Sequence, residues 1–140
     1  MIFNLKNKSK ENPNQNLINT AALLIHAAKI DQNYSIKEEE IIKKTLTEIG
    51  ANNNNVGEII NNGKKIEENS NQILDFTKEV KNMEEQNKIK IIETLWKIIY
   101  SNNEADIYET NLMRRLTGLL YIDSKLMGDI KERIKKEIIK

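Results

Sequence analysis

Hydrophobic residues recur along this chain at the three- and four-residue spacing that places them on one face of a helix. The spacing is clearest over residues 17–28 and 89–99, and no segment shows the polar–apolar alternation of a half-buried strand. The pattern predicts an all-α protein, a single compact bundle of about seven helices with short connections. The helices are expected near residues 16–30, 35–49, 56–68, 73–80, 84–99, 106–120 and 124–138.

A helix–loop–helix unit occurs twice in the chain. The first copy reads LIHAAKIDQNYSIKEEEII and the second reads LWKIIYSNNEADIYETNLM. A constant offset of 71 positions pairs Asp31 with Asn102 and Glu38 with Glu109. Because only two copies exist, the repeat indicates one internal pseudo-symmetry and not a solenoid. We expect the two pseudo-symmetric units to superpose by a twofold rotation.

Each copy carries a signal for the start of its second helix. Ser35-Ile-Lys-Glu38 and Asp106-Ile-Tyr-Glu109 both have the spacing of a capping box. In this motif the first side chain and the last one accept hydrogen bonds from backbone N–H groups that have no partner at a helix start. The spacing therefore predicts helices that begin next to Ser35 and Asp106.

The composition narrows the functional classes. The chain has 140 residues, of which 39% are hydrophobic and 31% charged, as in a globular protein with one core. It has no cysteine, which excludes thiolate chemistry, and one histidine, which excludes metal sites with several histidines. Because these catalytic groups are absent from the sequence, we expect no enzymatic activity. A net charge of +1 supplies no field that would attract nucleic acid, so we expect no such partner.

The N-terminal residues read as a leader and the rest as one domain. We expect a flexible leader over 1–13 and a helical domain over 14–140. The most apolar segment, residues 17–30, is shorter than the roughly 20 residues that a membrane span needs. The first residues, MIFNLKNKSK, lack the apolar stretch of a signal peptide. We therefore expect a cytoplasmic protein. The apolar residues and lysines of the leader also allow a peripheral contact with an anionic membrane, although docking on the bundle fits better.

The first loop has some features of a calcium loop. Oxygen-bearing side chains follow Asp31 at alternate positions, which suits a hard cation. Ile36 stands where an EF-hand needs glycine, and Ile42 stands where it needs a bidentate glutamate. The loop is therefore not an EF-hand.

A looser metal site is the alternative, and two interpretations remain open. Asp31 and Glu38 of the first unit, with Glu104 and Glu109 of the second, would offer carboxylates to Ca²⁺ or Mg²⁺ if the two units packed around a common axis. The competing interpretation assigns Glu38 and Glu109 to helix capping, which explains the spacing without a metal. We expect no other cofactor.

Other candidate residues have ordinary structural explanations. His26 lies in an apolar helix without a second histidine nearby, so we expect a buried or half-buried structural role. Trp96 and Tyr100 lie one turn apart and fit the core and its rim. The pair Arg114-Arg115 could bind a phosphate group, but a solvated helix face is the better interpretation.

The segment LWKIIYSNNEADIYETNLMRRLTGLL resembles the tellurite-resistance TerB-like proteins, in which Leu-Trp, Tyr-Glu and Arg-Arg pairs follow in this order. AALLIHAAKIDQNYSIKEEEII is similar to an earlier Ala-Asp-Gly loop of the same family, and the resemblance spans about residues 17–133. It implies an all-helical fold with pseudo-symmetric halves and clustered acidic residues that bind divalent cations. Asp31, Glu38 and Glu109 match those acidic positions.

The chain departs from the family pattern in both loops. Gln32 and Asn103 replace the family's glycines, and Asn102 replaces the second aspartate, which weakens a cation site. A related helical module is fused to co-chaperone domains, which implies an adaptor role. We therefore expect a non-enzymatic cytoplasmic interaction module that binds a protein partner and acts in a stress response. The alternative is a divalent-cation sensor that uses the acidic loops.

Overall fold

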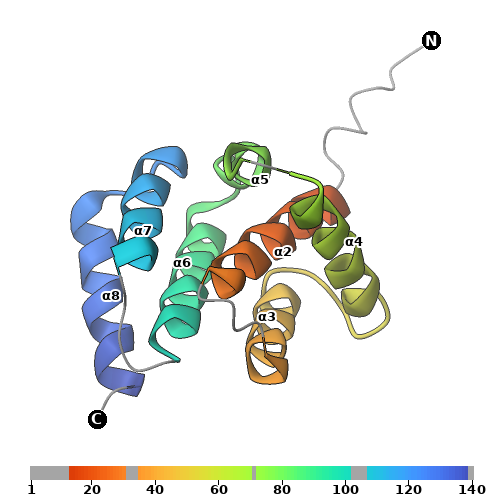
Figure 1. Ribbon diagram of the computed structural model, residues 1–140, viewed down its shortest axis with the longest axis horizontal. Helices are drawn as coiled ribbons and strands as arrows, with labels where there is room; N and C mark the ends of the chain where they lie inside the picture. Colours follow the sequence, from red (N-terminus) through yellow and green to blue (C-terminus); the bar gives the residue numbers. More distant parts are fainter. Residues whose placement is uncertain (1–12, 31–34, 71, 102–106, 139–140) are drawn as a thin grey trace.

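A computed structural model describes residues 13–30, 35–70, 72–101 and 107–138 (Figure 1). These residues form α-helices with short connections and contain no strand, which confirms the predicted all-α fold. The described helices are α2 (Pro13–Lys29), α3 (Ile36–Glu48), α4 (Val56–Glu68), α5 (Leu74–Val80), α6 (Glu85–Tyr100), α7 (Ile107–Leu119) and α8 (Ser124–Ile138).

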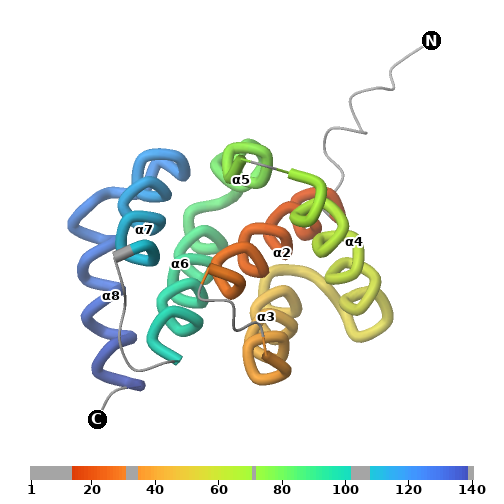
Figure 2. The backbone as a smooth tube through the Cα atoms, in the orientation of Figure 1, coloured from red at the N-terminus to blue at the C-terminus, as the bar shows by residue number. Residues whose placement is uncertain are grey.

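The helices are arranged in two groups, which contact each other directly and are also bridged by α5. Figure 2 shows α2, α3 and α4 on one side of the molecule and α6, α7 and α8 on the other. α2 packs most extensively against α4, and α6 packs most extensively against α8. α2 and α3 also contact α6, while α5 contacts α2 and α7 and so joins the two groups.

The helix bounds repeat with the offset seen in the sequence. Both ends of α7 lie 71 positions after the corresponding ends of α3. α2 and α6 end at equivalent positions, residues 29 and 100, and α4 and α8 overlap at the same offset. The repeat therefore includes a third helix in each half, which the sequence comparison did not include. The twofold rotation between the halves stays a prediction.

α2 is the central helix of the molecule. Its side chains are buried on all sides from Ala21 to Ala28, with the exception of the half-buried His26. The sequence predicted only one buried face, through Leu17, Ala21, Leu24 and Ala28. The difference arises because α3, α4, α5 and α6 all pack around α2, and a helix enclosed in this way has no solvated face.

The crossing of α2 and α4 depends on a glycine. A β-carbon at Gly63 would lie 2.8 Å from the Ala21 β-carbon, 3.1 Å from the Ala22 nitrogen and 3.2 Å from the Ile18 oxygen. Gly63 weakens the intrinsic helix propensity of α4, yet only a residue without a side chain permits this approach. The tight crossing compensates for the local weakness.

Helix starts agree with the sequence except for α2. We expected this helix to begin near residue 16, whereas it begins at Pro13, which is well suited to a first helical position because its missing N–H has no helical partner there. The start of α8 is capped by Asp123, whose Oδ2 accepts a hydrogen bond of 3.1 Å from the Leu126 N–H. Residues 1–12 of the expected leader lie outside the described part. No helix within that part is long and apolar enough to cross a membrane.

Candidate functional site

The predicted capping box at the start of α3 is present. Ser35 has an extended backbone, and its Oγ accepts a hydrogen bond of 3.3 Å from the Glu38 N–H. The Ser35 N–H in turn donates to Glu38 Oε1 at 2.8 Å. Glu38 is only 2% exposed, so these bonds replace water around its carboxylate. The first oxygen of Glu38 is thus engaged in holding the helix start.

The second oxygen of Glu38 reaches the other half of the molecule. The Ser101 hydroxyl lies 3.3 Å from Glu38 Oε2 and 2.7 Å from the Ile98 carbonyl oxygen, and it can donate its single hydrogen to either. Ser101 is the last described residue before the second loop, at the C-terminal end of α6. Glu38 therefore ties the start of α3 to the end of α6. Sequence analysis did not single out Ser101.

Glu109 is the counterpart of Glu38 in the second half. It lies in the first turn of α7, is 3% exposed and is engaged in interactions within the protein. Its expected capping partner, Asp106, lies outside the described residues. Two buried glutamates at equivalent positions of the repeat are consistent with the capping interpretation of both.

The proposed carboxylate cluster is only partly within the described structure. Of its four members, Glu38 and Glu109 are described, whereas Asp31 and Glu104 lie outside the described residues. Over the part that is described, no group of three or more acidic or histidine side chains is arranged to hold a metal ion. Glu38 Oε1 accepts the hydrogen bond from the Ser35 N–H, and Oε2 lies within hydrogen-bond distance of the Ser101 hydroxyl, so the carboxylate fits a cap better than a cation ligand.

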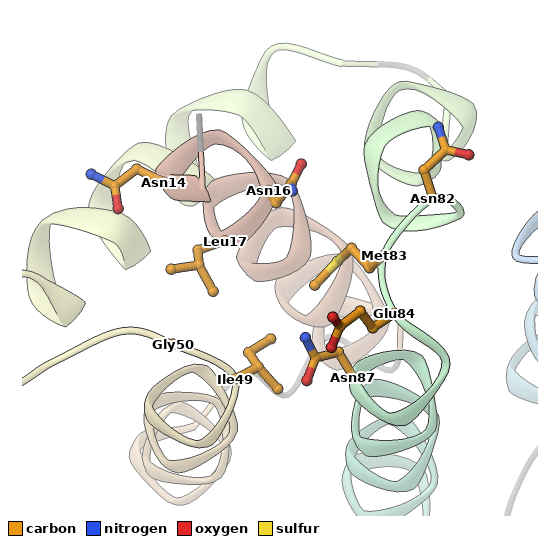
Figure 3. A pocket seen from close by; sticks show the side chains of 9 residues that line it. All are labelled: Asn14, Asn16, Leu17, Ile49, Gly50, Asn82, Met83, Glu84 and Asn87. Carbon is orange, nitrogen blue, oxygen red and sulfur yellow. The ribbon is translucent and has the colours of Figure 1, made fainter. Parts of the chain in front are cut away.

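One pocket lies where α2, the end of α3 and the start of α6 come together (Figure 3). It has a volume of about 460 Å³ and an apolar wall formed by Leu17, Ile49 and Met83. Glu84 and Asn87 point toward the same space, while three further asparagines lie at its edge. The lining contains no pair of groups suited to nucleophilic or acid–base catalysis.

A second pocket, the α2–α7 groove, joins the two halves. It has a volume of about 380 Å³ and is lined by the end of α2 and the first turns of α7. Ile30 and Leu112 supply apolar surface, and Tyr108 stands at the edge with 72% of its surface exposed. The remaining lining residues are His26, Asn111 and Arg115.

The two arginines of α7 have different surroundings. Arg114 donates to Asn111 Oδ1 at 3.1 Å. Arg115 lines the α2–α7 groove and forms no hydrogen bond or ion pair with any residue that the structure describes. Both side chains are exposed, as expected for a solvated helix face, but only Arg115 borders an apolar pocket.

His26 has the structural surroundings that the sequence predicted. Its Nδ1 lies 3.3 Å from Glu67 Oε2, and the other oxygen of Glu67 accepts a hydrogen bond of 2.8 Å from Lys29. The imidazole ring also lies 5.8 Å from the Phe76 ring. His26 thus links α2 to α4 and α5, and it also lines the α2–α7 groove.

Trp96 and Tyr100 are part of the core. Their rings stack with centroids 5.8 Å apart, and both side chains are buried, Tyr100 more deeply than the rim position that we expected. Burial, and secondarily the negative charge of Glu132, raises the pKa of Tyr100 above its ordinary value of 10.0.

A protein-family model described as tellurite resistance protein TerB matches residues 17–132. The chain belongs to this family. The match confirms the resemblance seen in the two sequence units and covers every lining residue of the α2–α7 groove. No curated protein and no solved structure matches the chain. The function of this TerB-family chain therefore has to be argued from its own residues.

Proposed function

We propose that this TerB-family chain is a non-enzymatic interaction module that binds a protein partner in the α2–α7 groove. The observation that carries the proposal is the combination of an apolar pocket, an exposed tyrosine and an arginine without a carboxylate partner among the described residues. Tyrosine and arginine are, together with tryptophan, the residue types enriched among the side chains that dominate binding at protein interfaces. An apolar side chain of the partner would enter between Ile30 and Leu112, beside Tyr108.

The charge of Arg115 favours a partner that brings a carboxylate. A guanidinium beside apolar surface gains most when a carboxylate meets it in a geometry that permits two hydrogen bonds. Asn111 and the exposed Tyr108 hydroxyl border the same opening and offer further polar contacts. We therefore expect an acidic residue next to an apolar one in the partner segment.

The internal repeat supplies a reference for this groove. The positions of α3 that correspond to Tyr108, Asn111 and Arg115 carry Lys37, Glu40 and Lys44. These three side chains are exposed and charged, as is usual for a solvated helix face. The aromatic and amide residues of the groove are thus particular to the second half, which favours a role in binding over a role in folding.

Catalysis is not part of the proposal because the candidate groups are already engaged. The Glu38 carboxylate caps α3, and His26 faces Glu67. The chain has no cysteine to act as a nucleophile. We propose that the module acts in the cytoplasm, as the sequence predicts. The cation-sensor alternative stays a prediction that a separate titration tests.

Affinity purification from the native cell, followed by quantitative mass spectrometry, tests the groove. We expect Tyr108→Ala and Arg115→Glu each to lose a protein that the wild type retains. Lys44→Glu is the matched control, because it makes the same change in charge at the equivalent position of the other half. Retention of the same proteins by the wild type and all three variants would refute a binding role for the α2–α7 groove.

A further inference from the structure

The end of α7 holds a tyrosine in a backbone conformation that usually requires glycine. Tyr121 has φ of 58°. Its N–H donates to the Gly118 carbonyl at 3.3 Å, and the Ile122 N–H donates to the Thr117 carbonyl at 3.0 Å. This is the hydrogen-bond pattern of a Schellman motif, in which the left-handed residue is commonly glycine. A β-carbon is strained in that conformation.

At the equivalent helix end, the first half of the repeat has a glycine. Gly50 occupies the position equivalent to Tyr121 and also has a positive φ. Its N–H donates to Thr47 at 3.3 Å, and the Ala51 N–H donates to Leu46 at 2.8 Å, so both halves end this helix with the same pair of bonds. The turn therefore works without a side chain, and the tyrosine in the second half needs another explanation.

Packing within the fold does not supply that explanation. Tyr121 is 65% exposed, so most of its ring makes no contribution to the core. Among the residues that the structure describes, its one ring contact is with the Lys81 ammonium, which lies 5.6 Å from the ring centroid. A cation–π contact at an exposed site is weak, and it does not outweigh the strain of a left-handed residue without glycine.

The tyrosine ring forms one wall of a third pocket, the α5–α7 groove. This groove has a volume of about 290 Å³ and is lined by Leu74, Thr77, Lys78, Lys81, Gly118, Leu119 and Tyr121. Leu74 is 44% exposed and, with Leu119, gives the groove an apolar floor. A β-carbon at Gly118 would meet nothing within 4 Å, so the absence of a side chain there keeps the groove open.

The charge of the groove is positive. Its lining contains two lysines and no carboxylate. Neither Lys78 nor Lys81 forms an ion pair with an acidic residue in the described ranges. A segment with negative charge would therefore meet two uncompensated ammonium groups at the edge of an apolar floor. Two lysines are too few for the row of phosphate contacts that nucleic acid requires, and the leucines favour an apolar side chain in the occupant.

We propose that the α5–α7 groove is a docking site for an acidic protein segment that also carries an apolar side chain. The apolar side chain lies over Leu74 and Leu119 against the Tyr121 ring, and acidic residues beside it meet Lys78 and Lys81. The strain at Tyr121 is retained because the ring is needed for binding. This surface is separate from the α2–α7 groove and does not depend on the function proposed for it.

Fluorescence anisotropy with a labelled peptide, made of glutamates around a central Leu-Phe pair, tests the site in the full-length chain. We expect saturable binding to the wild type and to Tyr121→Phe, which keeps the ring. Tyr121→Gly should bind about tenfold more weakly. The double variant Lys78→Glu/Lys81→Glu should also bind more weakly, because it reverses the charge of the groove. Gly118→Leu should bind more weakly because its side chain fills the groove. Lys37→Glu/Lys44→Glu, with the same change in net charge, should bind as the wild type does.

The thermal midpoint separates a binding role from a structural one. Tyr121→Gly removes the strain, so its midpoint should equal or exceed that of the wild type while its affinity for the peptide falls. The proposal is overturned if the wild type does not bind the peptide, or if Tyr121→Gly binds it equally well. It is also overturned if Tyr121→Gly unfolds at a clearly lower temperature, or if vesicles of anionic lipid bind in a Tyr121-dependent manner and the peptide does not.

Discussion

Lys88 donates a hydrogen bond of 2.9 Å to the carbonyl oxygen of Leu120 in the interior of the protein. The same ammonium group donates to the Lys81 carbonyl at 3.2 Å and lies 3.9 Å from Glu85. Lys81 and Leu120 stand at the C-terminal ends of α5 and α7, where carbonyl groups lack a partner within the helix. One buried cation of α6 thus fixes the two helix ends that border the α5–α7 groove.

Lys88→Met should lower the free energy of unfolding by about 2–4 kcal/mol, because it leaves one buried and one partly buried carbonyl group without a donor. Urea denaturation followed by circular dichroism measures the change. Lys90→Met is the matched control, since Lys90 lies on the same helix and its side chain is less buried. Equal stability of the two variants would show that the ammonium contacts contribute little.

Gly63→Ala should destabilise the protein by about 1–3 kcal/mol, because the new methyl group would overlap the Ala21 side chain at the α2–α4 crossing. Gly57→Ala lies on the same helix, and its β-carbon would meet nothing within 4 Å. That control should be neutral or more stable by about 0.5–1 kcal/mol, since alanine favours a helix over glycine. If Gly63→Ala behaved as Gly57→Ala does, the crossing would be looser than described.

Glu38→Ala should lower the stability of the protein by about 1–2 kcal/mol, because α3 loses its capping box and its bond to Ser101. Urea denaturation measures this change.

Under the capping interpretation, the thermal midpoint of the wild type should not change when Ca²⁺ or Mg²⁺ is added. A ligand that binds only the folded state would raise it. A cation-dependent rise that Asp31→Asn abolishes and Asn102→Asp enhances would establish the sensor function in place of the capping-only interpretation.

Tyr100 should make stability fall at alkaline pH. Its pKa is raised in the folded protein by burial and then by Glu132, so the unfolded chain loses this proton first, near pH 10. Its contribution to stability is full below about pH 10 and is lost as the pH rises through the folded pKa. Tyr100→Phe should lose less stability over this range than the wild type. Tyr121→Phe is the control, and identical pH profiles for all three proteins would contradict the assignment.

Local signals in the sequence predicted the helix starts and ends well. The capping box at the start of α3 spans only four residues, from Ser35 to Glu38. The local sequence is therefore enough to predict where this helix begins. The bond between Glu38 and Ser101 spans 63 positions and depends on how α3 meets α6, which no local pattern states. The burial of α2 on all sides has the same origin, because it results from the number of helices that surround it.

The candidate sites were less predictable than the fold. Arg115 was assigned to a solvated face, and its position beside an apolar pocket became visible only when α2 and α7 were placed together. The repeat did contain a signal at Tyr121, since the equivalent residue of the first half is glycine at the end of a helix. That comparison becomes informative once the backbone shows that both positions have positive φ.

The close crossing at Gly63 has a consequence for the motions of the molecule. Because a β-carbon at Gly63 would lie 2.8 Å from the Ala21 β-carbon, α2 and α4 pack closely there, and we expect the two helices to move together. α5 packs mainly against α2 and contacts α7 much less extensively. Slow opening should therefore concentrate at the boundary of α5 and α7, where amide hydrogen exchange would be faster than in α2 or α4.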